Sequence, residues 1–82
     1  MSKTIVTRTQ TGVRIESSLL KVLKGLAEYL GLSLGDLLEG IVLHTFDGKV
    51  PFNEDTLAVI GQLKAVYSCE LSADDSHNLE EK

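Results

Sequence analysis

Four side chains near the start of the chain have the chemistry needed to contact nucleic acid. Arg8, Gln10 and Arg14 stand at even-numbered positions of one stretch, and Lys3 precedes them. An arginine guanidinium forms paired hydrogen bonds with O6 and N7 of guanine, and a glutamine amide does so with N6 and N7 of adenine. A lysine ammonium is suited to phosphate oxygens. The alternative is that all four are ordinary solvated side chains.

The stretch that must position these side chains alternates with a period of two. From Thr4 to Ile15 the odd positions are all β-branched, while the even positions other than Val6 are mostly polar. This alternation predicts a half-buried β-strand whose even-numbered face points outward. One strand cannot satisfy its own backbone, so the pattern implies a second strand from a second copy of the chain. A hairpin turn at Thr11 and Gly12 is the alternative.

Two helices are predicted to follow the strand. Apolar residues recur at helical spacing over about 18–30, with Ser17 or Ser18 as the expected N-cap and Gly31 as the expected end. A second helix is predicted over about 34–46. Its residues are too apolar for a surface helix with one buried face, so it must be covered on most sides.

The second helix is expected to begin with a variant capping box formed by Ser33 and Asp36. Gly35 and Gly40 inside this helix each cost roughly 1 kcal/mol relative to alanine. Close approach of another backbone would explain them, and Gly25 in the preceding helix could serve the same purpose.

The rest of the chain is predicted to contain one further helix and a tail. Asn53 is an expected N-cap for a helix over about 54–68, after a break at Asp47 and Gly48. The last residues, 71–82, are polar and acidic without periodicity, which predicts a disordered tail. The expected organisation adds a flexible arm over 1–6 and leaves 51–70 as an additional C-terminal helix.

Charge is distributed unevenly along the chain of 82 residues, whose net charge is -4. Residues 1–24 hold five basic and one acidic side chain, a balance of +4, and residues 51–82 hold two basic and seven acidic ones, a balance of -5. A basic head and an acidic tail indicate two surfaces with different partners. The alternative is that these charges are simply solvated.

No constellation in the sequence indicates an enzyme, a metal site or a cofactor. The candidates His44, Cys69 and His77 fall on different segments, and the single cysteine rules out an intrachain disulfide. His44 is expected to be a hydrogen-bonded histidine of the core or of an interface, and not a ligand or base. The apolar runs are too short to span a bilayer, and Met1 is followed by no apolar leader. A cytoplasmic protein is therefore expected.

The order of these elements resembles the ribbon-helix-helix proteins, the Arc and Met repressor superfamily. The resemblance covers Thr7 to Phe46 and rests on an alternating strand ending in Val-Arg-Ile-Glu, a helix with serines at its start, a Gly-Leu-Ser break and an apolar second helix. It implies a mostly α fold with one short strand, in which two chains form an intertwined homodimer. A two-stranded antiparallel ribbon then enters the DNA major groove. Residues 7–50 would form this domain, with an extra C-terminal helix outside it.

The resemblance also implies which residues contact DNA and which form the dimer core. The predicted base-reading residues are Arg8, Gln10, Gly12 and Arg14. The predicted phosphate contacts are Lys3, Ser33 and the backbone N–H groups of Leu34 and Gly35, at the positive end of a helix. The predicted dimer core contains Val13, Ile15, Leu23, Leu26, Leu37, Leu38, Ile41 and Val42.

Together these features predict a sequence-specific, repressor-like transcriptional regulator that binds double-stranded DNA as a homodimer or as a dimer of dimers. The alternative is a ribbon-helix-helix module for protein interaction, similar to an antitoxin, that acts through its C-terminal helix or acidic tail. Neither hypothesis involves a cofactor, a metal or a membrane.

Overall fold

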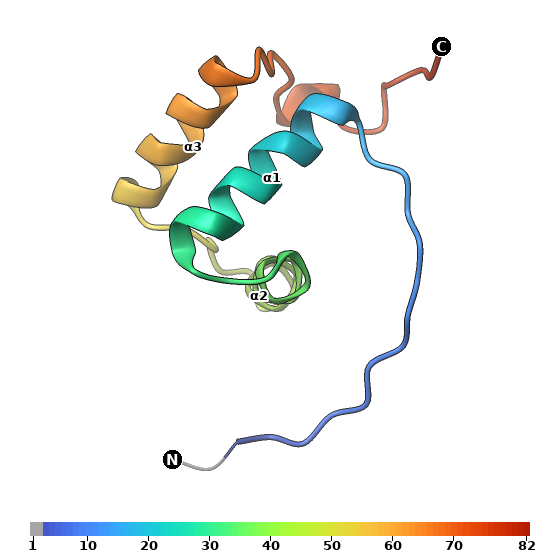
Figure 1. The fold of residues 1–82 in the computed structure, drawn as a ribbon, viewed down its shortest axis with the longest axis vertical. Helices are drawn as coiled ribbons and strands as arrows, with labels where there is room; N and C mark the ends of the chain where they lie inside the picture. Colours follow the sequence, from blue (N-terminus) through green and yellow to red (C-terminus); the bar gives the residue numbers. More distant parts are fainter. Residues whose placement is uncertain (1–2) are drawn as a thin grey trace.

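The computed structural model describes residues 3–82 and contains three α-helices, α1 (Ser17–Leu30), α2 (Leu34–Phe46) and α3 (Glu54–Val66). A short 3-10 turn, Ala73–Asp75, follows them. α1 is the central helix, because it contacts both α2 and α3 (Figure 1). The first two residues of the predicted flexible arm lie outside the described part of the chain.

The prediction of a ribbon-helix-helix fold is wrong. Residues 3–82 contain no strand and no sheet, so the described molecule is an all-α protein of three helices and has no strand from which a two-stranded ribbon could be built. Residues 3–16 are extended but lie apart from any partner strand (Figure 1). The physical reason is that the alternating stretch supplies one strand, and a strand needs a neighbour to complete its hydrogen bonds.

The alternative hairpin at Thr11 and Gly12 is also wrong. The tight two-residue hairpin turns require a positive φ. Among the glycines of the described chain, Gly31 and Gly48 adopt positive φ and Gly12 does not. Residues 4–15 therefore run on as one extended segment into α1 (Figure 1).

The N-cap of α1 is Glu16, not Ser17 or Ser18. Its carboxylate accepts hydrogen bonds from the backbone N–H of Ser18 (3.1 Å) and Leu19 (3.0 Å) and from the Ser18 hydroxyl (2.6 Å). These bonds satisfy donors that the first turn of a helix leaves free. They also hold the pKa of Glu16 below its ordinary value, with the Ser18 hydroxyl as the largest cause.

The other predicted caps are confirmed. Gly31 ends α1 with φ 70°, a left-handed conformation in which a side chain would be strained. At the start of α2 the Ser33 hydroxyl accepts from the N–H of Asp36 at 3.1 Å, which is one half of the expected capping box; the described chain has no return bond from the Ser33 N–H to the Asp36 carboxylate. The Asn53 side chain accepts from the N–H of Thr56 at the start of α3, at 2.8 Å. α3 ends at Val66, two residues before the predicted limit.

The core lies where α1 meets the other two helices. Its buried side chains are Leu26, Ala27 and Leu37, and the side chains packed around them are Leu23, Leu30, Ile41, Phe52, Ile60 and Leu63. Within residues 3–82, no backbone approaches Gly25 as expected, but a side chain does: a Cβ there would lie 3.0 Å from Cδ2 of Leu63. Gly40 has no such neighbour within 4 Å.

The C-terminal segment after α3 folds back toward the start of α1 (Figure 1). The Lys64 ammonium donates to the carbonyl of Leu71 at 2.7 Å, and the buried Cys69 lies in the same turn. Ser72 and Asp75 then form a reciprocal capping box around the 3-10 turn. The predicted disorder of residues 71–82 concerns motion in solution and stays a prediction.

Candidate nucleic-acid interface

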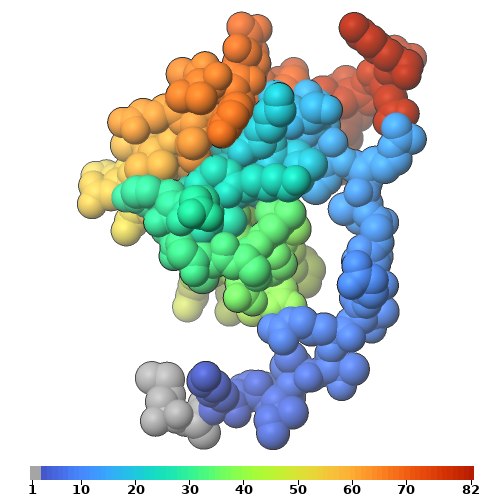
Figure 2. Space-filling model, viewed as in Figure 1, coloured from blue at the N-terminus to red at the C-terminus, as the bar shows by residue number. Residues whose placement is uncertain are grey.

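The N-terminal segment, residues 3–15, carries the predicted DNA-contacting side chains on an extended backbone. Lys3, Arg8, Gln10, Gly12 and Arg14 are all exposed. Figure 2 shows the segment as an arch that stands clear of the helices over much of its length. An open cleft of about 710 Å³ lies between this segment and α2.

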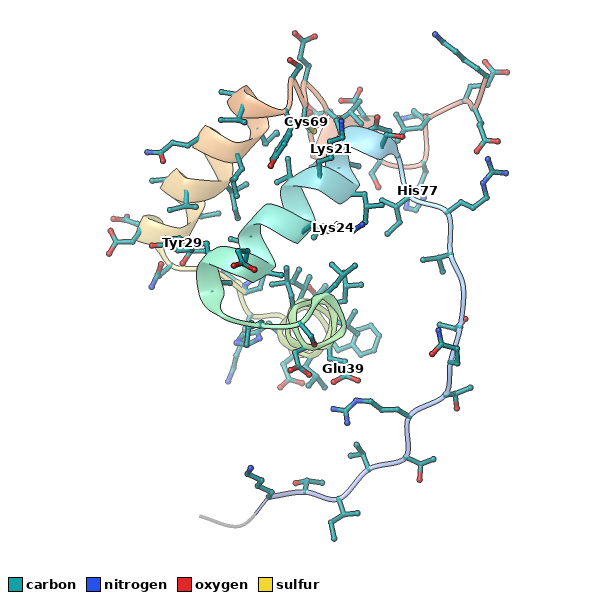
Figure 3. All side chains as sticks on the ribbon, in the orientation of Figure 1. Lys21, Lys24, Tyr29, Glu39, Cys69 and His77 are labelled. Carbon is teal, nitrogen blue, oxygen red and sulfur yellow. The ribbon has the colours of Figure 1, made fainter. Side chains whose placement is uncertain are left out.

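Arg8 is held by a carboxylate of the helical body. Its guanidinium donates from Nε and Nη2 to the two oxygens of Glu39, at 2.9 Å each. These hydrogen bonds lower the pKa of Glu39 and raise that of Arg8. Figure 3 shows Glu39 on α2. A guanidinium binds a phosphate or a guanine edge with the same paired geometry. The Arg8 donors that would contact DNA are therefore already bonded to Glu39.

Arg14 is also paired, with the acidic tail. Its Nη2 lies 2.9 Å from Oε2 of Glu81, and the two side chains are 85% and 66% exposed. An ion pair this exposed is weak, because water and salt screen it. Gln10 makes no side-chain hydrogen bond within residues 3–82, which leaves its amide open to solvent.

The predicted phosphate site at the start of α2 is partly occupied by the chain itself. The Ser33 hydroxyl already accepts from the N–H of Asp36, and the Asp36 carboxylate lies in the first turn. The N–H groups of Leu34 and Gly35 bond to no other group of the described chain. A carboxylate at this position competes with a phosphate for the positive end of the helix.

The structure divides the predicted dimer-core residues into three groups. Ile15 and Leu38 are half-buried and line the cleft beside the N-terminal segment. Leu23, Leu26, Leu37 and Ile41 pack inside the helical body of a single chain. Val13 and Val42 are exposed, at 72% and 44%. The most exposed apolar residues of α2, Leu43 at 65% and Phe46 at 81%, were absent from the predicted core.

The carboxylates of Glu39 and Glu81 are functional candidates that sequence reasoning missed. They lie 31 and 67 positions from the arginines they contact. No local spacing rule links residues so far apart, so only the opposed charges of head and tail could have indicated such pairing. The role of Glu16 was missed because glutamate is outside the residues commonly preferred at an N-cap.

The groups considered for other chemistry lie on different segments: His44 in α2, Cys69 in the turn after α3, and His77 beyond the 3-10 turn. His44 is hydrogen-bonded as predicted, since its Nδ1 lies 2.7 Å from the Gly40 carbonyl and must donate to it, but the residue is exposed. Within residues 3–82, no three His, Cys, Asp or Glu side chains gather closely enough to hold a metal ion. None of the described helices has the length and apolar character to cross a bilayer.

No protein-family model, no curated protein and no solved structure matches this chain. The ribbon-helix-helix resemblance therefore receives no support from relatives, and the case for the site rests on the residues themselves.

Proposed function

We propose that the protein is a DNA-binding regulator whose N-terminal segment is the part that contacts the double helix. The observation that supports this is the exposure of Arg8, Gln10 and Arg14 on an extended backbone outside the helical body. An extended arm can follow a DNA groove, and arginines enter a narrow minor groove because its negative potential is enhanced. The proposal needs no paired strands.

The helices are poorer candidates for contacting DNA. α1 and α2 are joined by a short turn at Gly31, the arrangement in which a second helix can enter the major groove. The outer side of α2, however, presents Glu39, Leu43 and Phe46, which offer no donor to a base edge or phosphate. The basic segment before α1 is therefore the better candidate.

DNA must displace two carboxylates from the segment. Glu39 holds Arg8 and Glu81 holds Arg14, both at exposed positions where ion pairs are weak. Double-stranded DNA presents one negative charge per about 1.7 Å of its axis, a much higher density than either carboxylate. The exchange is therefore feasible at low salt and becomes unfavourable as salt rises.

The test begins with selection of bound duplexes from a pool of random sequence, using the full chain. Fluorescence anisotropy on the enriched duplex then compares Arg14→Ala with the wild-type chain. Loss of one specific arginine contact should weaken binding by roughly 5- to 150-fold. Lys82→Ala is the control, since it removes a cation outside the segment. Failure to enrich any duplex, or equal binding by Arg14→Ala, would refute the proposal.

A second candidate is a protein-interaction module, similar to an antitoxin in acting through its C-terminal region. The acidic balance of residues 51–82, -5, favours a basic protein partner over DNA for that part of the chain. Salt separates the candidates, because DNA affinity falls steeply with salt concentration. Absence of DNA binding even at low salt would favour this second candidate.

A further inference from the structure

The outer face of α2 is apolar, although most helices of this kind present polar side chains to water. We define the α2 patch as Val42, Leu43, Phe46 and Val50, whose exposed fractions are 44, 65, 81 and 75%. At 100° per residue, the first three lie on the side of the helix opposite the buried Leu37. The patch is therefore a separate face of α2 and not the margin of the buried core.

We propose that a second copy of this chain covers the α2 patch, with the two α2 helices packed antiparallel about a two-fold axis. In a two-fold contact the same surface serves both partners, so it must complement itself. A continuous row of apolar side chains meets this condition. The contact joins helix to helix and involves no strand.

The charges at the two ends of the patch favour the antiparallel direction. Glu39 lies on the patch side near the start of α2, and Lys49 lies just beyond its end. The N–H of Lys49 donates to the carbonyl of His44 at 2.8 Å, which keeps the chain against the helix there. Parallel packing would bring like charges and like helix ends together, whereas antiparallel packing opposes them.

The spacing of these residues is consistent with one register. An antiparallel pair centred on position 44 places Phe46 opposite Val42 of the second copy. The same register places Glu39 opposite Lys49 of the second copy. Glu39 can accept from this lysine while it still accepts from Arg8, because a carboxylate has about four lone-pair sites. Asp47 caps α2 near Lys49 and reduces the net charge at that end without changing the preferred direction.

The size of the patch indicates a modest, reversible association. Stable interfaces bury about 800 Å² on each partner, which four side chains alone do not supply. Ile5 and Val13 of the N-terminal segment are also strongly exposed, at 96 and 72%, and the segment lines the cleft beside α2. A second copy seated on α2 would lie next to this segment, so contact area beyond the patch is available.

Sedimentation equilibrium of the full chain tests the inference. We expect the mass to rise with concentration from 8.9 kDa toward twice that value. Phe46→Asp should raise the dissociation constant by at least about tenfold, as for a central interface residue. Leu43→Glu is a second variant with the same expectation. Val66→Asp is the matched control, because Val66 is 71% exposed on α3 and should leave association unchanged.

Charge reversal tests the direction of packing. Lys49→Glu alone should weaken association, and Glu39→Lys combined with Lys49→Glu should restore it. Circular dichroism checks that each variant keeps its helices. A chain that stays monomeric up to about 0.5 mM, or a dimer that persists in both patch variants, would overturn the inference. These outcomes are separate from DNA binding: a chain that dimerises but ignores DNA refutes the proposed function alone.

Discussion

Glu16 shows how a single side chain can replace the expected serine cap. Three donors from Ser18 and Leu19 converge on its carboxylate, which sits where the positive end of α1 favours negative charge. The residue follows a basic segment proposed to meet DNA, where an acid would be unwelcome in contact with phosphate. Its carboxylate is instead turned into the helix start, so the acid serves α1.

The first prediction concerns this cap. Glu16→Ala should lower the melting temperature at pH 7, because α1 loses the acceptor for two backbone donors. The pKa of Glu16 is lowered in the folded state, so the stabilisation is present above the ordinary glutamate pKa and is lost as pH falls through the lowered value. Thermal melts of both chains should therefore converge in strong acid. Ser17→Ala is the control, and an equal loss in that variant would contradict the assignment.

At the scale of the elements, two glycines inside helices are expected to respond differently to substitution by alanine. A Cβ added at Gly61 in α3 would have no neighbour within 4 Å, whereas at Gly25 it would meet Leu63 at 3.0 Å and Tyr67 at 3.6 Å. Gly61→Ala should raise the free energy of unfolding by about 0.5–1 kcal/mol, through lower backbone entropy in the unfolded chain. Gly25→Ala should gain less or lose stability. Urea unfolding measures both, and equal gains would mean that α3 moves aside freely.

The next prediction concerns the contribution of Ser33, the N-cap of α2, to stability. Ser33→Ala should cost about 1 kcal/mol of unfolding free energy, because the N–H of Asp36 loses its acceptor at 3.1 Å. Ser33→Asn should retain most of the stability, since asparagine can accept the same bond. Urea unfolding of the two variants separates loss of the cap from any general intolerance at this site. Equal losses would show that the hydroxyl bond contributes little.

The helices could be predicted from the sequence because their signals are local. Gly31, Ser33 and Asn53 each act within four residues of their own position, and all three stand where the structure ends or begins a helix. Whether residues 4–15 form a strand could not be predicted from the sequence, because a strand is stable only with a neighbouring strand. The alternation of residues 4–15 described side-chain types correctly but carried no information about a partner strand.

At the scale of the whole molecule, the pairing of distant charges was beyond sequence reasoning. The contact between Arg8 and Glu39 depends on how far the segment arches over α2, which no residue pattern encodes. The contact between Arg14 and Glu81 depends on the turn after α3, which brings the tail back to the start of α1 (Figure 1). Only the opposite charge of the two chain ends was visible beforehand.

The contact between tail and segment makes the last prediction, which assumes the proposed DNA binding. Glu81 forms an ion pair with the guanidinium of Arg14. Glu81→Gln should therefore tighten binding to a selected duplex by roughly two- to fivefold, the range expected of an exposed ion pair. Glu70→Gln is the matched control, because it changes the net charge by the same amount at an exposed site with no ion pair to Arg14. If the Glu81 carboxylate competes with DNA for Arg14, only Glu81→Gln should bind the duplex more tightly. Equal gains in both variants would mean that the tail acts through its total charge, and the tail would then repel DNA without holding the arginine.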